Sequence, residues 1–245
     1  MLWRPIAILP NIVVTDSIEN DQIVITVAGD PRVQALAEQK PILAKFLRKF
    51  SDTHGNDIVP SVILWAYDQT ITSKPELEAI RNFRDAVAIS HIAFSHSRIL
   101  SGAKVVPGVL WANYFSLYPW MLALDETTIV CDTPAMLGIH GLSSFKGQSS
   151  PELSQQSLTR HECDRPLLDA LQRRWVAAWS GGEKAWSDIA LFRSLNMAYW
   201  ASAMPAGSEA ATFYDVGRSI ALWVSAFEIL SHPGHNDTTS LKKNV

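Results

Sequence analysis

The pattern best suited to chemistry in this sequence is a set of titratable side chains at seven-residue intervals. Arg84, His91 and Arg98 recur in a segment whose apolar residues have helical periodicity. On a helical wheel all three fall on or beside the inward-facing apolar stripe. An imidazole can assist proton transfer and a guanidinium can stabilise developing negative charge. An exposed Arg84 and His91 would therefore suit acid–base chemistry on a substrate that develops negative charge during the reaction.

The same side chains also fit a structural role. A buried guanidinium needs a carboxylate or several carbonyls, because an unpaired charge in a core is strongly destabilising. Glu228, beside the apolar seam of the last predicted helix, is the candidate partner of Arg84. This interpretation predicts a buried Arg84–Glu228 ion pair, a hydrogen-bonded His91 and a polar network that includes Arg98.

Other common chemistries find little support. The sequence has no glycine-rich nucleotide loop, no Gly-x-Ser-x-Gly and no His-Glu-x-x-His. Two cysteines and two histidines contain the atoms for a zinc site, but only His161 and Cys163 are closely spaced, whereas structural zinc sites usually use two close pairs. We therefore predict no metal site and no cofactor, with Cys131 and His140 outside any such cluster.

Residues 1–72 are predicted to form an α/β portion. Asp30 followed by Pro31 is typical of a helix start, and Pro41 separates this helix from a second one that runs to about Phe50. Apolar, β-branched runs bounded by turn residues predict strands at Ile6–Leu9, Ile12–Thr15, Ile23–Val27 and Val62–Trp65.

Residues 73–245 are predicted to be mainly helical, with a long irregular insertion at about 103–160. Ser73 and Glu76 have the spacing of a capping box. The sequence thus predicts an α+β, mainly α fold. Apolar periodicity indicates four helices. They run from Ser73 to about Leu100, over Pro166–Ser180, over about Glu183–Met204 and over about Glu209–His232.

Three short segments resemble the helical part of Apea-like HEPN proteins. They are Leu222–His232, which reads LWVSAFEILSH, Asn196–Tyr199 and Phe83–Val87. The resemblance covers about residues 75–235. It implies antiparallel helical hairpins packed as a bundle, and a homodimer.

Catalytic HEPN proteins resemble one another in an Arg-x4-6-His motif that two subunits bring together as a metal-independent ribonuclease site. Arg84 and His91 meet this spacing, although the resemblance would place the motif after the helix that contains Phe227–Leu230. Two hypotheses follow. The first is a HEPN-like binding or regulatory protein with RNA as a candidate partner, and the second is a metal-independent endoribonuclease that uses Arg84 and His91.

Charge and hydropathy limit the partners. The net charge is -3, and basic and acidic residues nearly balance in both halves, so a nucleic-acid contact would have to be local. No apolar run approaches the ~18 residues of a membrane span, and no secretory signal is visible, so we predict a cytoplasmic protein without membrane contact. Nine tryptophans and broad apolar helix faces predict a homodimer formed by helices.

Overall fold

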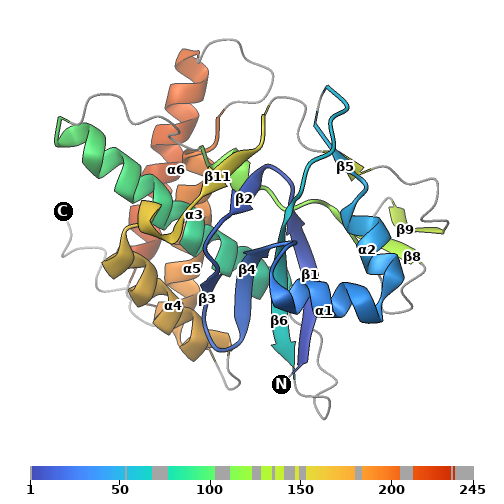
Figure 1. Cartoon of the computed structure of the whole chain (residues 1–245). Helices are drawn as coiled ribbons and strands as arrows, with labels where there is room; N and C mark the ends of the chain where they lie inside the picture. Colours follow the sequence, from blue (N-terminus) through green and yellow to red (C-terminus); the bar gives the residue numbers. More distant parts are fainter. Residues whose placement is uncertain are drawn as a thin grey trace.

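The fold is α+β and mainly α, as the sequence predicts (Figure 1). The computed structural model describes residues 2–52, 54–67, 77–102, 111–122, 128–133, 136–140, 147–148, 153–179, 184–204, 212–232 and 234. The predicted capping box at Ser73 and Glu76 lies outside these residues.

An antiparallel sheet forms the centre of the molecule. Its strands are β1 (Leu2–Leu9), β6 (Ser61–Tyr67), β4 (Ile23–Val27) and β3 (Ile18–Glu19), in the spatial order β1-β6-β4-β3. Ile8 pairs with Val62, and Val24 pairs with Leu64. Because side chains alternate across a strand, these four residues share one face of the sheet, while their neighbours point to the other.

The helices α1 (Pro31–Gln39) and α2 (Pro41–Leu47) cover that face of the sheet. As predicted, Asp30 caps α1, where its side chain accepts a hydrogen bond from the Arg32 N–H at 2.8 Å. Apolar residues of the two helices and of the short strand β5 (Phe50–Ser51) pack against Ile8, Val24, Val62 and Leu64; the buried ones are Val33, Leu43, Phe46, Leu47 and Phe50.

The helices α3 (Leu77–Leu100) and α4 (Arg165–Trp179) pack on the opposite face. Trp175 joins the layers, because its ring contacts Trp65 of the sheet at 5.4 Å and Phe83 of α3 at 5.5 Å between centroids. The Trp175 indole N–H donates to the Ala79 carbonyl at 2.8 Å. A fully buried tryptophan therefore has a partner for its polar atom as well as packing on both sides.

The helix α5 (Trp186–Ala201) packs against α3, and α6 (Phe213–Ser231) packs against α5. Thr212 and Asp215 form a capping box at the start of α6. In α6 only Ala226 is buried, so this helix lies at the edge of the bundle.

The region from 103 to 160 contains short elements, two of which pair with strands of the N-terminal portion. Its described elements are the 3-10 helix η1 (Ala112–Phe115) and the strands β7 (Trp120–Leu122), β8 (Thr128–Thr133), β9 (Met136–His140), β10 (Gly147–Gln148) and β11 (Gln156–Leu158), followed by η3 (Arg160–Glu162). The strands β7, β8 and β9 pair antiparallel. In contrast, β10 pairs parallel with β5 (Phe50–Ser51), and β11 pairs parallel with β2 (Ile12–Val14).

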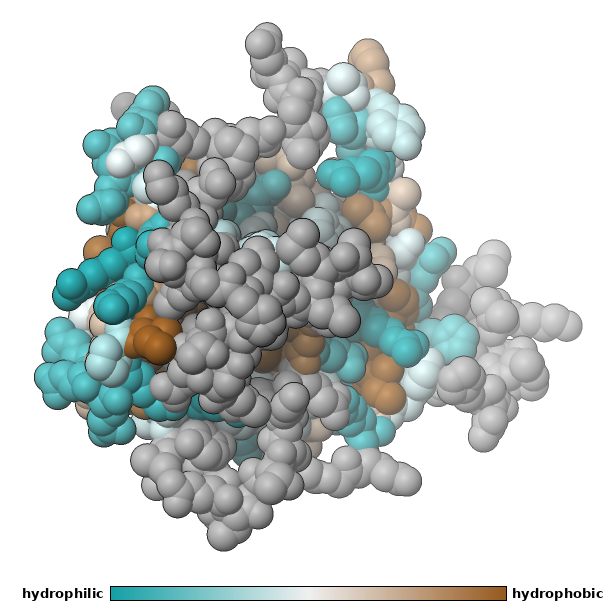
Figure 2. All heavy atoms as spheres, turned by 90° about the vertical axis from the view of Figure 1, so that its right-hand side faces the viewer, coloured by the Kyte–Doolittle hydropathy of each residue, from teal (hydrophilic) through white to brown (hydrophobic). Residues whose placement is uncertain are grey.

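Figure 2 shows the face on the side of α2 and β5. Its described residues are mixed, with hydrophilic side chains around smaller hydrophobic areas. The large exposed apolar side chains of the described part are instead concentrated on α6.

Candidate functional site

Arg84 lies inside the molecule. Its residue exposure is 6%, and its Nε donates to the Asp85 Oδ1 at 2.6 Å. Nη1 donates to the Phe115 carbonyl at 3.1 Å, and the guanidinium lies over the Tyr199 ring at 3.8 Å from the centroid. An ion pair, a backbone acceptor and a cation–π contact together compensate for the loss of water around this charge.

Asp85 completes this network. It is fully buried, and its second oxygen accepts from the Asn196 side-chain amide of α5 at 3.1 Å. Burial raises the pKa of Asp85 and outweighs the opposing effect of the adjacent Arg84 charge. Burial also raises the pKa of Tyr199, whose hydroxyl lies 3.5 Å from that of Ser116. The network therefore links α3, α5 and the segment that follows η1.

The predicted Arg84–Glu228 pair is wrong. Arg84 pairs with Asp85, while Glu228 is exposed on α6. Arg98 is also exposed, near the end of α3, where its guanidinium lies 5.6 Å from the Phe94 ring centroid. The physical reason is that the last turns of α3 extend beyond the packed core, so a side chain at this position reaches water.

His91 has its own partners. Its Nδ1 lies 2.8 Å from the Glu162 carbonyl, and its Nε2 lies 3.3 Å from the Ser95 hydroxyl. Because a carbonyl only accepts, Nδ1 carries the proton, and the Ser95 hydroxyl donates to Nε2. Burial lowers the pKa of His91 despite the hydrogen bond to Glu162. The ring is thus a neutral link between α3 and η3.

Arg84 and His91 do not form one open site. They are seven residues apart on a helix, or about 10 Å along its axis. His91 is 3% exposed, and both side chains use their polar atoms on internal partners. This geometry suits a structural network and lacks the open groove that a ribonuclease needs.

A second pair, Arg48 and His54, also meets the Arg-x4-6-His spacing, although the resemblance to HEPN proteins does not point to it. Arg48 follows α2, and His54 follows β5 in a turn where its N–H donates to the Asp52 carboxylate at 2.9 Å. Both residues are exposed. The spacing itself was the available signal, but the two residues do not share a helix.

Of the zinc candidates, the structure describes the side chains of His161 and Cys163. Burial raises the pKa of the Cys163 thiol to about 12, which keeps it protonated, whereas His161 is exposed. The side chains of Cys131 and His140 lie outside the described residues. Within the described part, no group of three or more His, Cys, Asp or Glu side chains could hold a metal ion.

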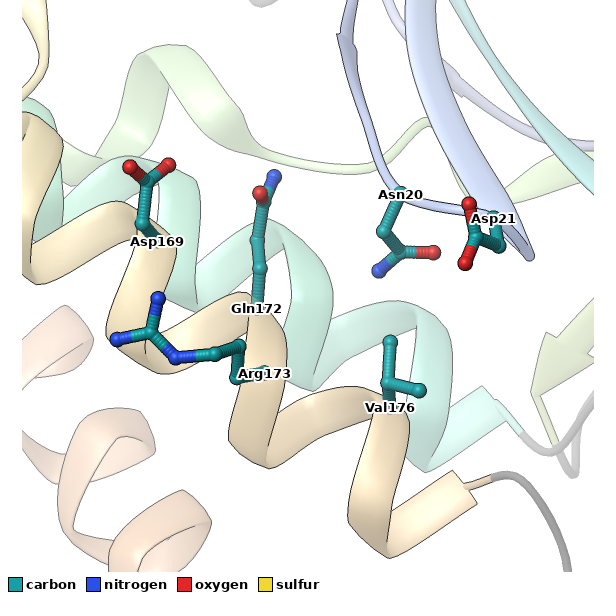
Figure 3. A pocket seen from close by; sticks show the side chains of 6 residues that line it. All are labelled: Asn20, Asp21, Asp169, Gln172, Arg173 and Val176. Atoms are coloured by element: carbon teal, nitrogen blue, oxygen red, sulfur yellow. The ribbon is translucent and has the colours of Figure 1, made fainter.

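One pocket of about 410 Å³ lies between α4 and the turn from β3 to β4 (Figure 3). Asn20 and Asp21 line it from the turn, and Asp169, Gln172, Arg173 and Val176 line it from α4. The buried side-chain nitrogens of Asn20 and Gln172 have no hydrogen-bond partner. The side-chain oxygen of Asn20 accepts hydrogen bonds from the N–H groups of Gln22 and Ile23. The side-chain group of Asn20 without a partner is therefore the NH2 donor. The lining presents both signs of charge.

A second pocket of about 330 Å³ adjoins the Arg84 network. It lies where α3, α5 and α6 meet, and Asn196, which donates to Asp85, forms part of its lining. Two arginines line it as well, Arg81 from α3 and Arg193 from α5.

Comparison of the chain with protein-family models, curated proteins and solved structures found no match. The likeness to HEPN proteins therefore stays a prediction from the sequence. None of the described helices is long and apolar enough to cross a membrane.

Proposed function

We propose that this protein is a HEPN-like helical binding module that works as a homodimer, with α6 as the pairing element. The observation that carries this proposal is the apolar surface of α6. Phe213 is 98% exposed, Ile220 is 59% exposed and Phe227 is 63% exposed. An apolar face of this length is typical of a helix that packs against a partner.

The exposed residues form one continuous stripe. At 100° per residue, Phe213, Val216, Ile220, Val224 and Phe227 fall within an arc of about 80° on α6, and the buried Ala226 lies outside this arc. Gly217 lies directly beside the arc and Ala221 further round the helix, and no heavy atom of another element comes within 4 Å of a Cβ built on Gly217. Small residues at this spacing let a second helix approach closely.

The composition of the stripe favours a second copy of this chain as the partner. Its five members are all apolar, and the charged residues Arg218 and Glu228 lie outside it on the exposed surface of α6. A twofold interface is built from one patch used twice, so two copies of α6 would each cover the apolar stripe of the other without burying a charge.

Sedimentation of the Ile220→Glu variant tests the proposal. The unmodified protein is expected to sediment as a dimer at micromolar concentration and the variant as a monomer, because a carboxylate at the centre of the stripe would be buried without a partner. Ile99→Glu is the matched control, since Ile99 is also exposed but lies on α3. A monomer for the unmodified protein, or equal dissociation by the control, would contradict the proposal.

This proposal gives Arg84 and His91 no catalytic role. We expect no cleavage when the purified protein is incubated with mixed RNA in EDTA. The His91→Ala and His54→Ala variants identify the source of any cleavage that is seen. Cleavage by the unmodified protein that is lost in His91→Ala, with the fold retained, would instead support the endoribonuclease hypothesis.

A further inference from the structure

The pocket beside the Arg84 network has more hydrogen-bond donors than the protein itself uses. Arg81 and Arg193 line it from neighbouring helices and are both exposed. Among the residues that the structure describes, neither arginine has a hydrogen-bond or ion-pair partner. Two unpaired guanidiniums at one pocket form a positive site that attracts an anion.

Asn82 adds an independent observation. It lines the same pocket and is 5% exposed, and its buried side-chain nitrogen has no hydrogen-bond partner. A buried donor without an acceptor costs free energy, and such groups are uncommon in folded proteins. An oxygen-rich ligand in the pocket would supply the missing acceptor.

The carboxylates nearby do not neutralise this site. Glu78 lies on the rim, 3.7 Å from the Lys184 ammonium. Asp85 is buried and does not line the pocket; its two oxygens accept from Arg84 and Asn196, and the Arg81 charge also acts to lower its pKa against the larger effect of burial. The lining is therefore cationic, even though the whole chain carries a net charge of -3.

We propose that this pocket binds the terminal phosphate of a phosphate monoester. Such a group carries close to two negative charges at pH 7 and has three acceptor oxygens, which match the two guanidiniums and the Asn82 amide. Phe192, Met197 and Ile229 form the apolar part of the lining and leave a surface for the organic body of the ligand. A volume of about 330 Å³ is within the range of small-ligand sites. The proposal does not depend on the dimer.

Calorimetric titration with adenosine 5′-monophosphate tests the site, with adenosine as the ligand that lacks the phosphate. Binding of the nucleotide and none of adenosine is expected. Arg81→Gln and Arg193→Gln should each weaken binding at least about tenfold, because each removes a charge-assisted contact. Arg165→Gln removes an exposed arginine elsewhere, at the start of α4, and should leave the affinity within about twofold. No binding at millimolar nucleotide, or an equal loss in the control, would overturn the proposal.

Asn82→Leu separates ligand recognition from general electrostatics. It keeps all charges and removes only the buried donor, so it should weaken nucleotide binding several-fold while the thermal midpoint stays equal or rises. The second pKa of a phosphate monoester is about 6, so binding should also weaken below that pH. An unchanged affinity in Asn82→Leu, with the fold retained, would contradict the assigned geometry.

The phosphate could come from a free nucleotide or from the 5′ end of an RNA. Short oligoadenylates of equal length with a 5′-phosphate or a 5′-hydroxyl distinguish these sources. Tighter binding of the 5′-phosphorylated RNA than of the mononucleotide assigns the site to RNA ends, and weaker binding assigns it to free nucleotides. If the two RNAs bind equally and both bind more tightly than the mononucleotide, the terminal phosphate is not read and the proposal is overturned.

Discussion

The buried charges of Arg84 and Asp85 depend on each other. Arg84 has two further contacts, with Phe115 and Tyr199, but Asp85 is the only carboxylate paired with it in the described part of the chain. Removing one member of a buried pair leaves the other desolvated without compensation, which costs more than the pair contributes in net terms. The stability of this region is therefore most sensitive to Asp85.

Asp85→Ala is expected to lower the free energy of unfolding by about 3–5 kcal/mol, because it leaves the Arg84 guanidinium in the core without a counter-ion. Urea denaturation gives the value. Glu228→Ala is the matched control and should leave the midpoint unchanged, because Glu228 is exposed. If the control loses more stability than Asp85→Ala, the assignment of the partner is incorrect.

His91 should make stability depend on pH. Its pKa in the folded protein is lowered by burial from the ordinary value of 6.5, so the unfolded chain binds a proton first as the pH falls. The stabilisation from a neutral, buried His91 is therefore present above pH 6.5 and is lost as the pH falls from there toward the folded pKa. His91→Gln should flatten the plot of unfolding free energy against pH in this window. His96→Gln, an exposed change on the same helix, should leave the slope as it is.

The sequence predicts most of the helices and strands, but it does not predict which groups the buried polar side chains on them contact. The strand at Ile23–Val27, the Asp30 cap and the helix to Leu100 are confirmed, because each depends on local periodicity or capping chemistry. A seven-residue repeat drifts by about 20° per heptad on a straight helix, so positions two heptads apart do not share one environment. Arg84 is buried and Arg98 is not, and the wheel alone could not show where the core ends.

The candidate site is harder to predict from the sequence than the helices and strands, because it is formed by contacts between residues far apart in the chain. Side chains at i and i+1 on a helix do not normally face each other, so the sequence does not indicate Asp85 as the partner of Arg84. The acceptors for Arg84 and His91 are backbone carbonyls at Phe115 and Glu162, which any residue type could supply. The pocket at Arg81 and Arg193 needed the packing of α3 against α5, which no local pattern specifies.

The capping box of α6 should contribute measurably to the stability of that helix. The Thr212 hydroxyl accepts from the Asp215 N–H, and the Asp215 carboxylate accepts from the Thr212 N–H at 3.0 Å. Thr212→Ala is expected to cost about 1 kcal/mol and to speed hydrogen exchange over the first turns of α6. Thr212→Ser keeps the hydroxyl and should behave like the unmodified protein. Equal exchange in both variants would show that the cap does not hold the helix start.

At the scale of the whole molecule, the predicted portions at 1–72 and 73–245 share one hydrophobic core. Leu9 and Ile63 of the sheet belong to the same buried cluster as Phe83, Leu168 and Trp175 of the helices. The sheet thus has one face that only the later helices cover. We expect the two portions to unfold together.

Urea unfolding should give one transition, with the same midpoint from tryptophan fluorescence and from far-ultraviolet circular dichroism. A fragment of residues 1–72 should not fold alone, because one face of its sheet would be exposed to water; a nuclear magnetic resonance spectrum with narrow amide dispersion would show this. Two separate transitions, or a well-dispersed spectrum of the fragment, would establish independent domains.

The parallel pairing of β2 with β11 also bears on how the chain reaches its native state. Ile12 pairs with Gln156, so this ladder closes only after most of the polypeptide has left the ribosome. Contacts between residues so distant in sequence slow folding, because the loop between them must be ordered first. Until α4 emerges, the apolar face at Leu9 and Ile63 is covered only in part, by α3, and can associate with other nascent chains. Synthesis of this protein should therefore include a chaperone-dependent interval that ends when β11 and α4 reach the sheet.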